Sequence, residues 1–395
     1  MIKIVSNQVS PNLNFSDFFV GLGAILFRKR HNFEQFFGSN KYVLTNSART
    51  GLGEIIDVLN LSEKNKVVGI PAFICGVVAT PFLEAGFKVV WIDTDKNGLL
   101  DFDNFKKKSD QISVLVAPHI FGQKLDLSRF AEVCRKKNIF LIEDCAHNFV
   151  SGEIKNADAR ILSFGREKVF SCVSGGAVVW KESFDHKKLT KPPFFWTFRH
   201  LFQILIFSIA IPFWQKGGKI LPWIFRKIGF LPLAVTTQEK LGMEDFPRFS
   251  MPVPMQRILK RQFAQTKKIN THRKSVAEKW TEIARKLWPE VEIIVPKNCF
   301  RVILKFKNKD LRDKVLKQAK KVGFDFRDWD GVPIAPAGVD LERFGYMEGS
   351  CPQAEEFANI YLTLPTNIRT ELKDLEEFEK QLDNRATDQP NNFGK

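Results

Sequence analysis

The chain has 395 residues, of which 44% are hydrophobic, so it can bury the cores of two domains and is not wholly disordered. Its formal net charge of +16 favours anionic partners, which include nucleotide diphosphates, acidic lipid headgroups and nucleic acid. Six cysteines without CxxC spacing predict free thiols in a reducing cytoplasm, with neither a disulfide framework nor a metal site. The first fifteen residues lack a signal-peptide pattern, so we expect no export.

Short apolar runs alternate with helical patterns from about Tyr42 to Trp180. This alternation is typical of βα units, whose mainly parallel strands are buried on both faces. Apolar residues at helical spacing predict helices at 51–59 and 127–137. The apolar runs predict strands at 67–70, 88–92, 113–118, 140–143, 159–163 and 177–180.

The segment 191–235 departs from this pattern, because it is aromatic and basic and contains no acidic residue. Its apolar stretch 201–214 is shorter than the roughly twenty residues of a membrane-spanning helix, and Pro212 interrupts it, so we expect no span. Two alternatives remain: a helical hairpin in a membrane interface, or an insertion that packs on the core or on a partner subunit. A weaker copy of the pattern occurs at 15–30.

The C-terminal part predicts a smaller α+β domain. Helical patterns at 256–286, 310–322, from Pro352 and from Glu371 surround a strand-like run at 300–306. The expected division is an N-terminal segment 1–40, a large domain 41–190, the hydrophobic basic insertion 191–250, a smaller domain 251–385 and a frayed tail 386–395.

The most informative motif is LIEDCAH at 141–147, followed by SFGREK at 163–168 and a Gly-Gly pair. An Asp at the end of a buried strand and a Lys on a nearby turn are the two groups that pyridoxal 5'-phosphate (PLP) needs. The carboxylate keeps the ring nitrogen protonated, and the amine holds the aldehyde as a Schiff base until a substrate amine displaces it. We therefore interpret Asp144 and Lys168 as catalytic and cofactor-binding residues. The alternatives are a helix cap for Asp144 and a surface position for Lys168.

Further polar residues suit the rest of such a cofactor. Ser47, Ala48 and Arg49 lead into a predicted helix, whose amino terminus can bind a phosphate. Ser163 can donate its hydroxyl from the opposite side. His147 either reaches the phenolic oxygen of the cofactor or serves as a structural donor.

These motifs resemble the DegT/DnrJ/EryC1/StrS family of PLP-dependent sugar aminotransferases. The resemblance extends over about residues 40–385, through the segment 71–95, the turn 118–122, CPQAEE and LPTN. It implies a fold-type I α/β structure, with a mainly parallel sheet of the seven-stranded type flanked by helices, and a homodimer with its active site between subunits. It also implies that Lys168 carries the cofactor, Asp144 pairs with the ring nitrogen, and Ser163 with the Ala48 and Arg49 amides binds the phosphate. A lysine at 168 indicates transamination, because members that dehydrate sugars carry His there.

Two positions depart from the family pattern. Cys75 replaces the aromatic ring that stacks on the cofactor in many members, so either this thiol forms a thin apolar lid or Phe73 repositions. The segment 246–249 lacks the Asn that crosses to the partner's phosphate, and we expect Arg49 and Arg166 to compensate with their charges.

The resemblance implies an enzyme that acts in polysaccharide or glycoconjugate biosynthesis, and we expect it in the cytoplasm. If the segment 191–235 is the interfacial hairpin, it would bring the enzyme to the inner face of the membrane. The enzyme would move an amino group from an amino acid, most simply glutamate, to a keto sugar on a nucleotide diphosphate or lipid carrier. The alternative is a catalytically silent membrane-surface or scaffolding protein. We expect no nucleic-acid partner, because no recognition motif accompanies the charge. Arg301, Arg327 and Arg343 are candidates for contacts with a carboxylate or diphosphate, but we interpret each as an ordinary surface residue and leave it out of the site.

Overall fold

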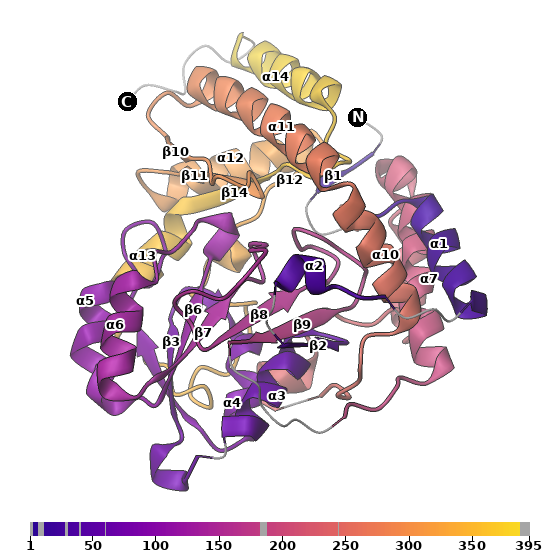
Figure 1. Cartoon of the computed structure of the whole chain (residues 1–395). Helices are drawn as coiled ribbons and strands as arrows, with labels where there is room; N and C mark the ends of the chain where they lie inside the picture. The colour runs from indigo at the N-terminus through magenta and orange to yellow at the C-terminus, as the bar shows by residue number, and fades with distance from the viewer. Residues whose placement is uncertain are drawn as a thin grey trace.

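A computed structural model of the chain describes residues 3–6, 12–27, 31–38, 41–59, 61–181, 188–243 and 245–387. Of the expected frayed tail 386–395, residues 386–387 belong to the last helix, and 388–395 lie outside the described residues. A seven-stranded sheet in the order β2-β9-β8-β7-β6-β3-β5 forms the centre of the molecule (Figure 1). Its strands are β2 (Lys41–Thr45), β3 (Val67–Pro71), β5 (Lys88–Ile92), β6 (Val114–Pro118), β7 (Phe140–Asp144), β8 (Ala159–Ser163) and β9 (Gly176–Trp180).

Strand β9 alone runs opposite to the other six strands of this sheet, so the expected mainly parallel α/β architecture is confirmed. All six strands predicted from apolar runs are present. The sequence did not indicate β2, because this edge strand is only half-buried and its residues show no long apolar run.

The sheet is buried on both faces. Alternate residues of a strand point to opposite sides, so Leu115 and Ala117 of β6 join one hydrophobic core while Val114 and Val116 join another. The first core contains residues of α1 (Phe15–Phe27), α5 (Phe102–Lys108), α6 (Ser128–Lys137) and α10 (Val253–Ala264). The second contains residues of α3 (Ala48–Leu59), α4 (Thr80–Glu84) and α13 (Pro352–Ile360).

A smaller antiparallel sheet, in the order β10-β11-β14, lies above the large one (Figure 1). The buried Trp280 packs at the centre of its core against Phe324, Phe326 and Phe378. The elements of this region are β10 (Glu292–Ile294), β11 (Arg301–Lys305), β12 (Phe324–Asp325), β14 (Tyr361–Pro365), α11 (Thr266–Leu287), α12 (Lys309–Lys321) and α14 (Leu372–Thr387). Two short strands pair outside these sheets: β1 (Val5–Ser6) pairs with β12, and β4 (Ile74–Cys75) pairs with β13 (Ile334–Ala335). The remaining short helices are α2 (Glu34–Phe37) and α9 (Thr237–Lys240).

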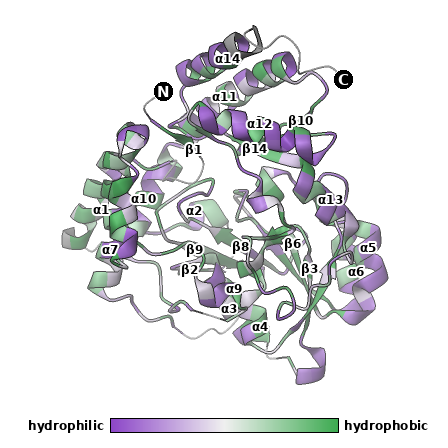
Figure 2. Ribbon diagram, turned by 180° about the vertical axis from the view of Figure 1, so that it is seen from behind, coloured by the Kyte–Doolittle hydropathy of each residue, from purple (hydrophilic) through white to green (hydrophobic). Residues whose placement is uncertain are grey.

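The segment 191–235 forms α7 (Phe194–Ala210), a 3-10 turn (Ile211–Lys216) and α8 (Ile220–Lys227). Helix α7 lies beside α1 and α10 at one edge of the molecule (Figure 2). Gly21 of α1 allows α7 to approach closely because it has no side chain: a Cβ at this position would lie 2.4 Å from Cδ1 of Leu201. The segment therefore packs partly on the core, as the second of the two alternatives proposes.

The helical stretch Phe194–Lys216 has 23 residues, and by length and composition it meets the requirement for crossing a membrane. This helical stretch is longer than the apolar stretch 201–214, but core helices of soluble proteins can have the same length and composition. The α-helix itself ends at Ala210, before Pro212, and the backbone departs from helical geometry at Phe213 (φ −111°, ψ 18°), so the expected interruption is confirmed. About half of the apolar window, 44%, is buried inside the protein.

Candidate functional site

One cavity of about 370 Å³ opens at the carboxyl ends of β7 and β8, next to the amino terminus of α3. Asp144 ends β7 and Ser163 ends β8, and the ends of neighbouring parallel strands meet at the same sheet edge. The structure thus brings together every residue that the sequence predicts for the site. The cavity is lined by Ser47, Ala48, Arg49, Cys75, Asp144, His147, Ser163 and Lys168.

Asp144 is a buried carboxylate that faces a lysine. It accepts a hydrogen bond from the backbone N–H of Ala146 at 2.8 Å. Burial raises the pKa of Asp144, while the Ala146 bond and the charge of Lys168 act in the opposite direction. A cationic group bound beside this carboxylate would therefore stabilise its charged form.

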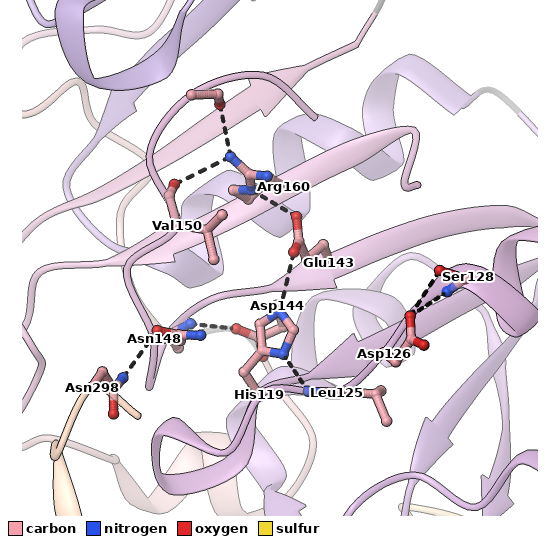
Figure 3. Close-up of polar contacts among 12 residues, drawn as sticks. His119, Leu125, Asp126, Ser128, Glu143, Asp144, Asn148, Val150, Arg160 and Asn298 are labelled. Carbon is pink, nitrogen blue, oxygen red and sulfur yellow. Dashed lines mark hydrogen bonds and ion pairs between the residues drawn. The ribbon is translucent and has the colours of Figure 1, made fainter. Parts of the chain in front are cut away.

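A buried polar network supports the end of β7 from behind (Figure 3). Glu143 accepts hydrogen bonds from Arg160 at 2.7 Å and from His119 at 3.1 Å. Because the Leu125 N–H donates to Nδ1 of His119, the imidazole proton resides on Nε2 and points to Glu143. His119, Glu143 and Cys145 lie close enough to hold a metal ion. However, the histidine and carboxylate atoms already have partners in the protein, so we interpret the cluster as a structural support for Asp144.

Lys168 lies on the turn that follows β8. Its N–H donates to the Gly165 carbonyl at 3.2 Å, and the side chain of Asn12 donates to the Lys168 carbonyl at 2.9 Å. Among the described residues, the Lys168 ammonium has no ion pair or hydrogen bond. Burial lowers its pKa, while Cys75 and Asp144 partly offset the effect. A larger neutral fraction makes the amine a better nucleophile.

His147 stacks on Phe121, with ring centroids 5.6 Å apart and an interplanar angle of 10°. The Phe121 N–H donates to Nδ1 of His147 at 3.2 Å, so the ring proton resides on Nε2. Burial, together with the charges of Lys168 and Arg301, holds the pKa of His147 well below its usual value. His147 is therefore a neutral hydrogen-bond donor in this cavity.

The amino terminus of α3 provides the candidate phosphate site. The Ser47 hydroxyl accepts a hydrogen bond from the Thr50 N–H at 3.1 Å and thus caps the helix. The first N–H groups of a helix have no acceptor within it, so those of Ala48 and Arg49 can bind an anion. Gly176 makes this arrangement possible, because a Cβ at this position would lie 2.5 Å from the carbonyl carbon of Ser47.

The structure corrects the expectation for Arg49, agrees with that for Arg166, and decides between Cys75 and Phe73. The guanidinium of Arg49 forms an ion pair with the buried Glu239, so its charge is already neutralised and only its amide remains for a phosphate. Arg166 does line the cavity, where its Nη1 lies 3.4 Å from the side-chain oxygen of Gln203. Phe73 is fully buried in an aromatic cluster, which leaves Cys75 at the cavity wall.

Sequence reasoning named Arg301, the first residue of β11, as a candidate contact but did not select it for the site. We expected an ordinary surface arginine, but the side chain is buried and lines the cavity with Arg327 and Trp329. Nε of Arg301 has no hydrogen-bond partner, and no ion pair involves this guanidinium within the described chain. Only the tertiary fold reveals this residue, because β11 lies more than 130 positions after Lys168 in the sequence. Arg343 is indeed exposed and pairs with Asp340.

Residues 24–193 match the model of the DegT/DnrJ/EryC1/StrS aminotransferase family. A UDP-4-amino-4,6-dideoxy-N-acetyl-beta-L-altrosamine transaminase from Campylobacter jejuni is 28% identical over 165 residues, which cover 38% of this chain and 43% of that protein. A dTDP-4-amino-4,6-dideoxy-D-glucose transaminase from Shigella dysenteriae is 28% identical over 166 residues, covering 39% of this chain and 44% of that protein. The alignments thus span less than half of these relatives.

Similarity in three dimensions extends over the whole chain. The PLP form of the putative sugar aminotransferase Spr1654 from Streptococcus pneumoniae superimposes with a TM-score of 0.69 at 16% identity. The superposition covers 98% of this chain and 99% of the other. The fold-type I expectation is therefore confirmed, and residues 24–193 resemble the DegT/DnrJ/EryC1/StrS aminotransferase family, as the sequence predicts.

Proposed function

We propose that this protein is a PLP-dependent aminotransferase that transfers an amino group from an amino acid to a keto sugar. The observation that carries the proposal is the single cavity lined by both Lys168 and Asp144. The same cavity offers a capped helix terminus for a phosphate and a neutral histidine for an oxygen. These groups fit the aldehyde, ring nitrogen, phosphate and phenolic oxygen of PLP.

The residues of the chain have distinct roles in this proposal. PLP, when bound, supplies an electron sink next to the carbon of the substrate amine. The Asp144 carboxylate holds a proton at the ring nitrogen. Lys168 would hold the cofactor through its side-chain amine and, as a neutral amine, would take up and release the proton at the substrate carbon. The Ser163 hydroxyl and the α3 amides fix the phosphate, and Cys75 covers the ring as a small apolar group.

The proposed acceptor is a keto sugar on a diphosphate carrier, and the proposed donor is glutamate. The two transaminase relatives carry UDP- and dTDP-sugar names, and the net charge of +16 favours anionic substrates. We further propose a homodimer in the cytoplasm, whose exposed apolar surface on α1, α7 and α8 contacts the inner face of a membrane. A silent scaffold with the same fold is disfavoured, because it would need neither the lysine nor the carboxylate in this cavity.

Replacing Lys168 tests the proposed covalent attachment. We expect the purified wild type, reconstituted with PLP, to show the absorbance band of lysine-bound cofactor, and Lys168→Ala to lose it together with the glutamate half reaction. Exposed Lys136→Ala on α6 is the control and should retain both. A wild type that remains colourless after reconstitution would exclude the enzyme and favour the scaffold.

We propose that Arg301 binds the carboxylate of the amino donor. A buried guanidinium without an anionic partner is unfavourable, and a substrate carboxylate would satisfy it with paired hydrogen bonds. Arg301→Gln should raise KM for glutamate at least about tenfold in the donor half reaction. Arg343→Gln, an exposed arginine outside the cavity, should leave this KM unchanged. Equal KM values for the Arg301 variant and the wild type would refute the assignment.

A further inference from the structure

A second cavity, of about 800 Å³, adjoins the candidate active site. Seven residues line both cavities, among them Ser47, Ser174 and His200. The remaining wall comes largely from α7, α8 and the residues that follow α8. A molecule in the second cavity can therefore extend into the space that Lys168 lines.

Two helices contribute the same short motif to this cavity. Helix α7 carries WTFRH at 196–200, and α8 carries WIFRK at 223–227, so each has Trp, Phe, Arg and a further basic side chain in the same order. Residues three and four apart share a helix face, and Trp196, Arg199, Trp223 and Arg226 all line the cavity.

The phenylalanine of each motif points elsewhere. Phe198 and Phe225 both pack against Phe202 of α7, with ring centroids 5.6 and 6.0 Å apart. Neither phenylalanine lines the cavity. Each helix thus anchors its apolar face in the protein and presents its indole and its arginine to the second cavity. Lys227 of α8 adds a further cation, whereas burial lowers the pKa of His200 of α7 to about 4 and keeps it neutral.

The second cavity has an excess of positive charge. Arg199, Arg226 and Lys227 line it, and within the described residues none of them has an ion pair. Nε of Arg199 is buried without a hydrogen-bond partner. Two acidic residues are also present. Glu239 is neutralised by its ion pair with Arg49, which leaves the exposed Asp245 as the opposing carboxylate.

We propose that this second cavity binds the diphosphate of the carrier that holds the keto sugar, an inference that rests on the proposed aminotransferase function. Guanidinium groups bind phosphate oxygens with paired hydrogen bonds, and Lys227, 5.8 Å from the Trp223 ring, adds a point charge. The sugar then extends through the shared opening toward Lys168.

Two carriers have this chemistry, a nucleoside diphosphate and an isoprenoid diphosphate. The indoles of Trp196 and Trp223 suit either, because a base stacks on an aromatic ring and an isoprenoid chain packs against one. The test therefore uses both classes of probe.

The experiment measures binding of inorganic pyrophosphate, UDP and farnesyl diphosphate to the PLP-loaded protein by calorimetry. Arg226→Gln/Lys227→Gln should weaken all three at least about tenfold. Lys216→Gln/Lys219→Gln is the matched control, because it removes the same charge from exposed positions of the same segment outside both cavities. Tighter binding of UDP than of pyrophosphate would identify a nucleotide carrier, and tighter binding of farnesyl diphosphate a lipid carrier.

The proposal would be overturned if both double variants bound pyrophosphate like the wild type. It would also be overturned if both variants lost the same affinity, because binding would then depend only on the net charge of the protein. Circular dichroism confirms that each variant is folded. The donor half reaction with glutamate should be unchanged in the control variant Lys216→Gln/Lys219→Gln. Failure of the aminotransferase proposal is seen separately, as loss of cofactor absorbance and of the half reaction, because the binding measurement also works on protein without cofactor.

Discussion

At the scale of single residues, the candidate site keeps charged groups in unfavourable surroundings. Burial lowers the pKa of Lys168 and raises that of Asp144, so both charged forms are less stable here than in water. Arg301 adds a buried cation that has no ion pair among the described residues. Such a site is ready to bind ligands of complementary charge, and it reduces the stability of the ligand-free protein.

The cost of burying the charged Lys168 predicts that Lys168→Met is more stable than the wild type, by an amount that depends on pH. The folded protein binds the Lys168 proton more weakly than the unfolded chain, so the unfavourable contribution is complete below the lowered pKa and disappears as pH rises through the usual value of 10.5. We expect the cofactor-free variant to melt roughly 2 °C above the cofactor-free wild type at pH 7, with a smaller gain at pH 10. Calorimetry at both pH values tests this, and a gain that grows with pH would contradict it.

At the scale of elements, the amino terminus of α3 links stability to cofactor binding. Its cap, Ser47, lies on the turn after β2, and Gly176 of β9 allows the turn to approach the sheet closely. A motif that looks like an ordinary N-cap in sequence is therefore held at the cavity by two neighbouring strands.

Ser47→Ala should lower the free energy of unfolding by about 1 kcal/mol and also weaken PLP retention, because the cap fixes the amides that bind the phosphate. Asp101→Ala is the matched control. Asp101 caps α5 through the Asn104 N–H at 2.7 Å and does not line the cavity. It should lose similar stability with unchanged PLP affinity. Equal PLP affinities in both variants would show that the amino terminus of α3 does not bind the phosphate.

At the scale of the whole molecule, the exposed large apolar side chains gather on α1 and on the segment 191–235. The latter includes Phe194, Phe195, Phe213, Trp223 and Ile228, each more than half exposed. Basic residues accompany them, and no acidic residue lies between positions 186 and 238. This composition suits contact with anionic lipids.

Flotation with phosphatidylglycerol vesicles tests the membrane contact. Phe194→Ser/Ile228→Ser should reduce vesicle binding at least about tenfold, because both side chains would leave the lipid interface. Met347→Ser/Leu372→Ser removes two exposed apolar side chains elsewhere and should have no effect. Binding should also weaken in 0.5 M salt, which screens the charges. If the wild-type protein does not float with vesicles, the membrane contact is refuted, and a protein partner is favoured for this surface.

The sequence by itself determined six of the seven strands of the central sheet, the mainly parallel architecture and the neighbourhood of Asp144, Ser163 and Lys168. These features depend on local signals: apolar runs buried on both faces, and strand ends that meet at one sheet edge. The sequence could not reveal Arg301, the ion pair that neutralises Arg49, or the second cavity. Each of these depends on contacts between segments far apart in the chain, and burial of a polar side chain is decided by what packs over it rather than by its neighbours in sequence.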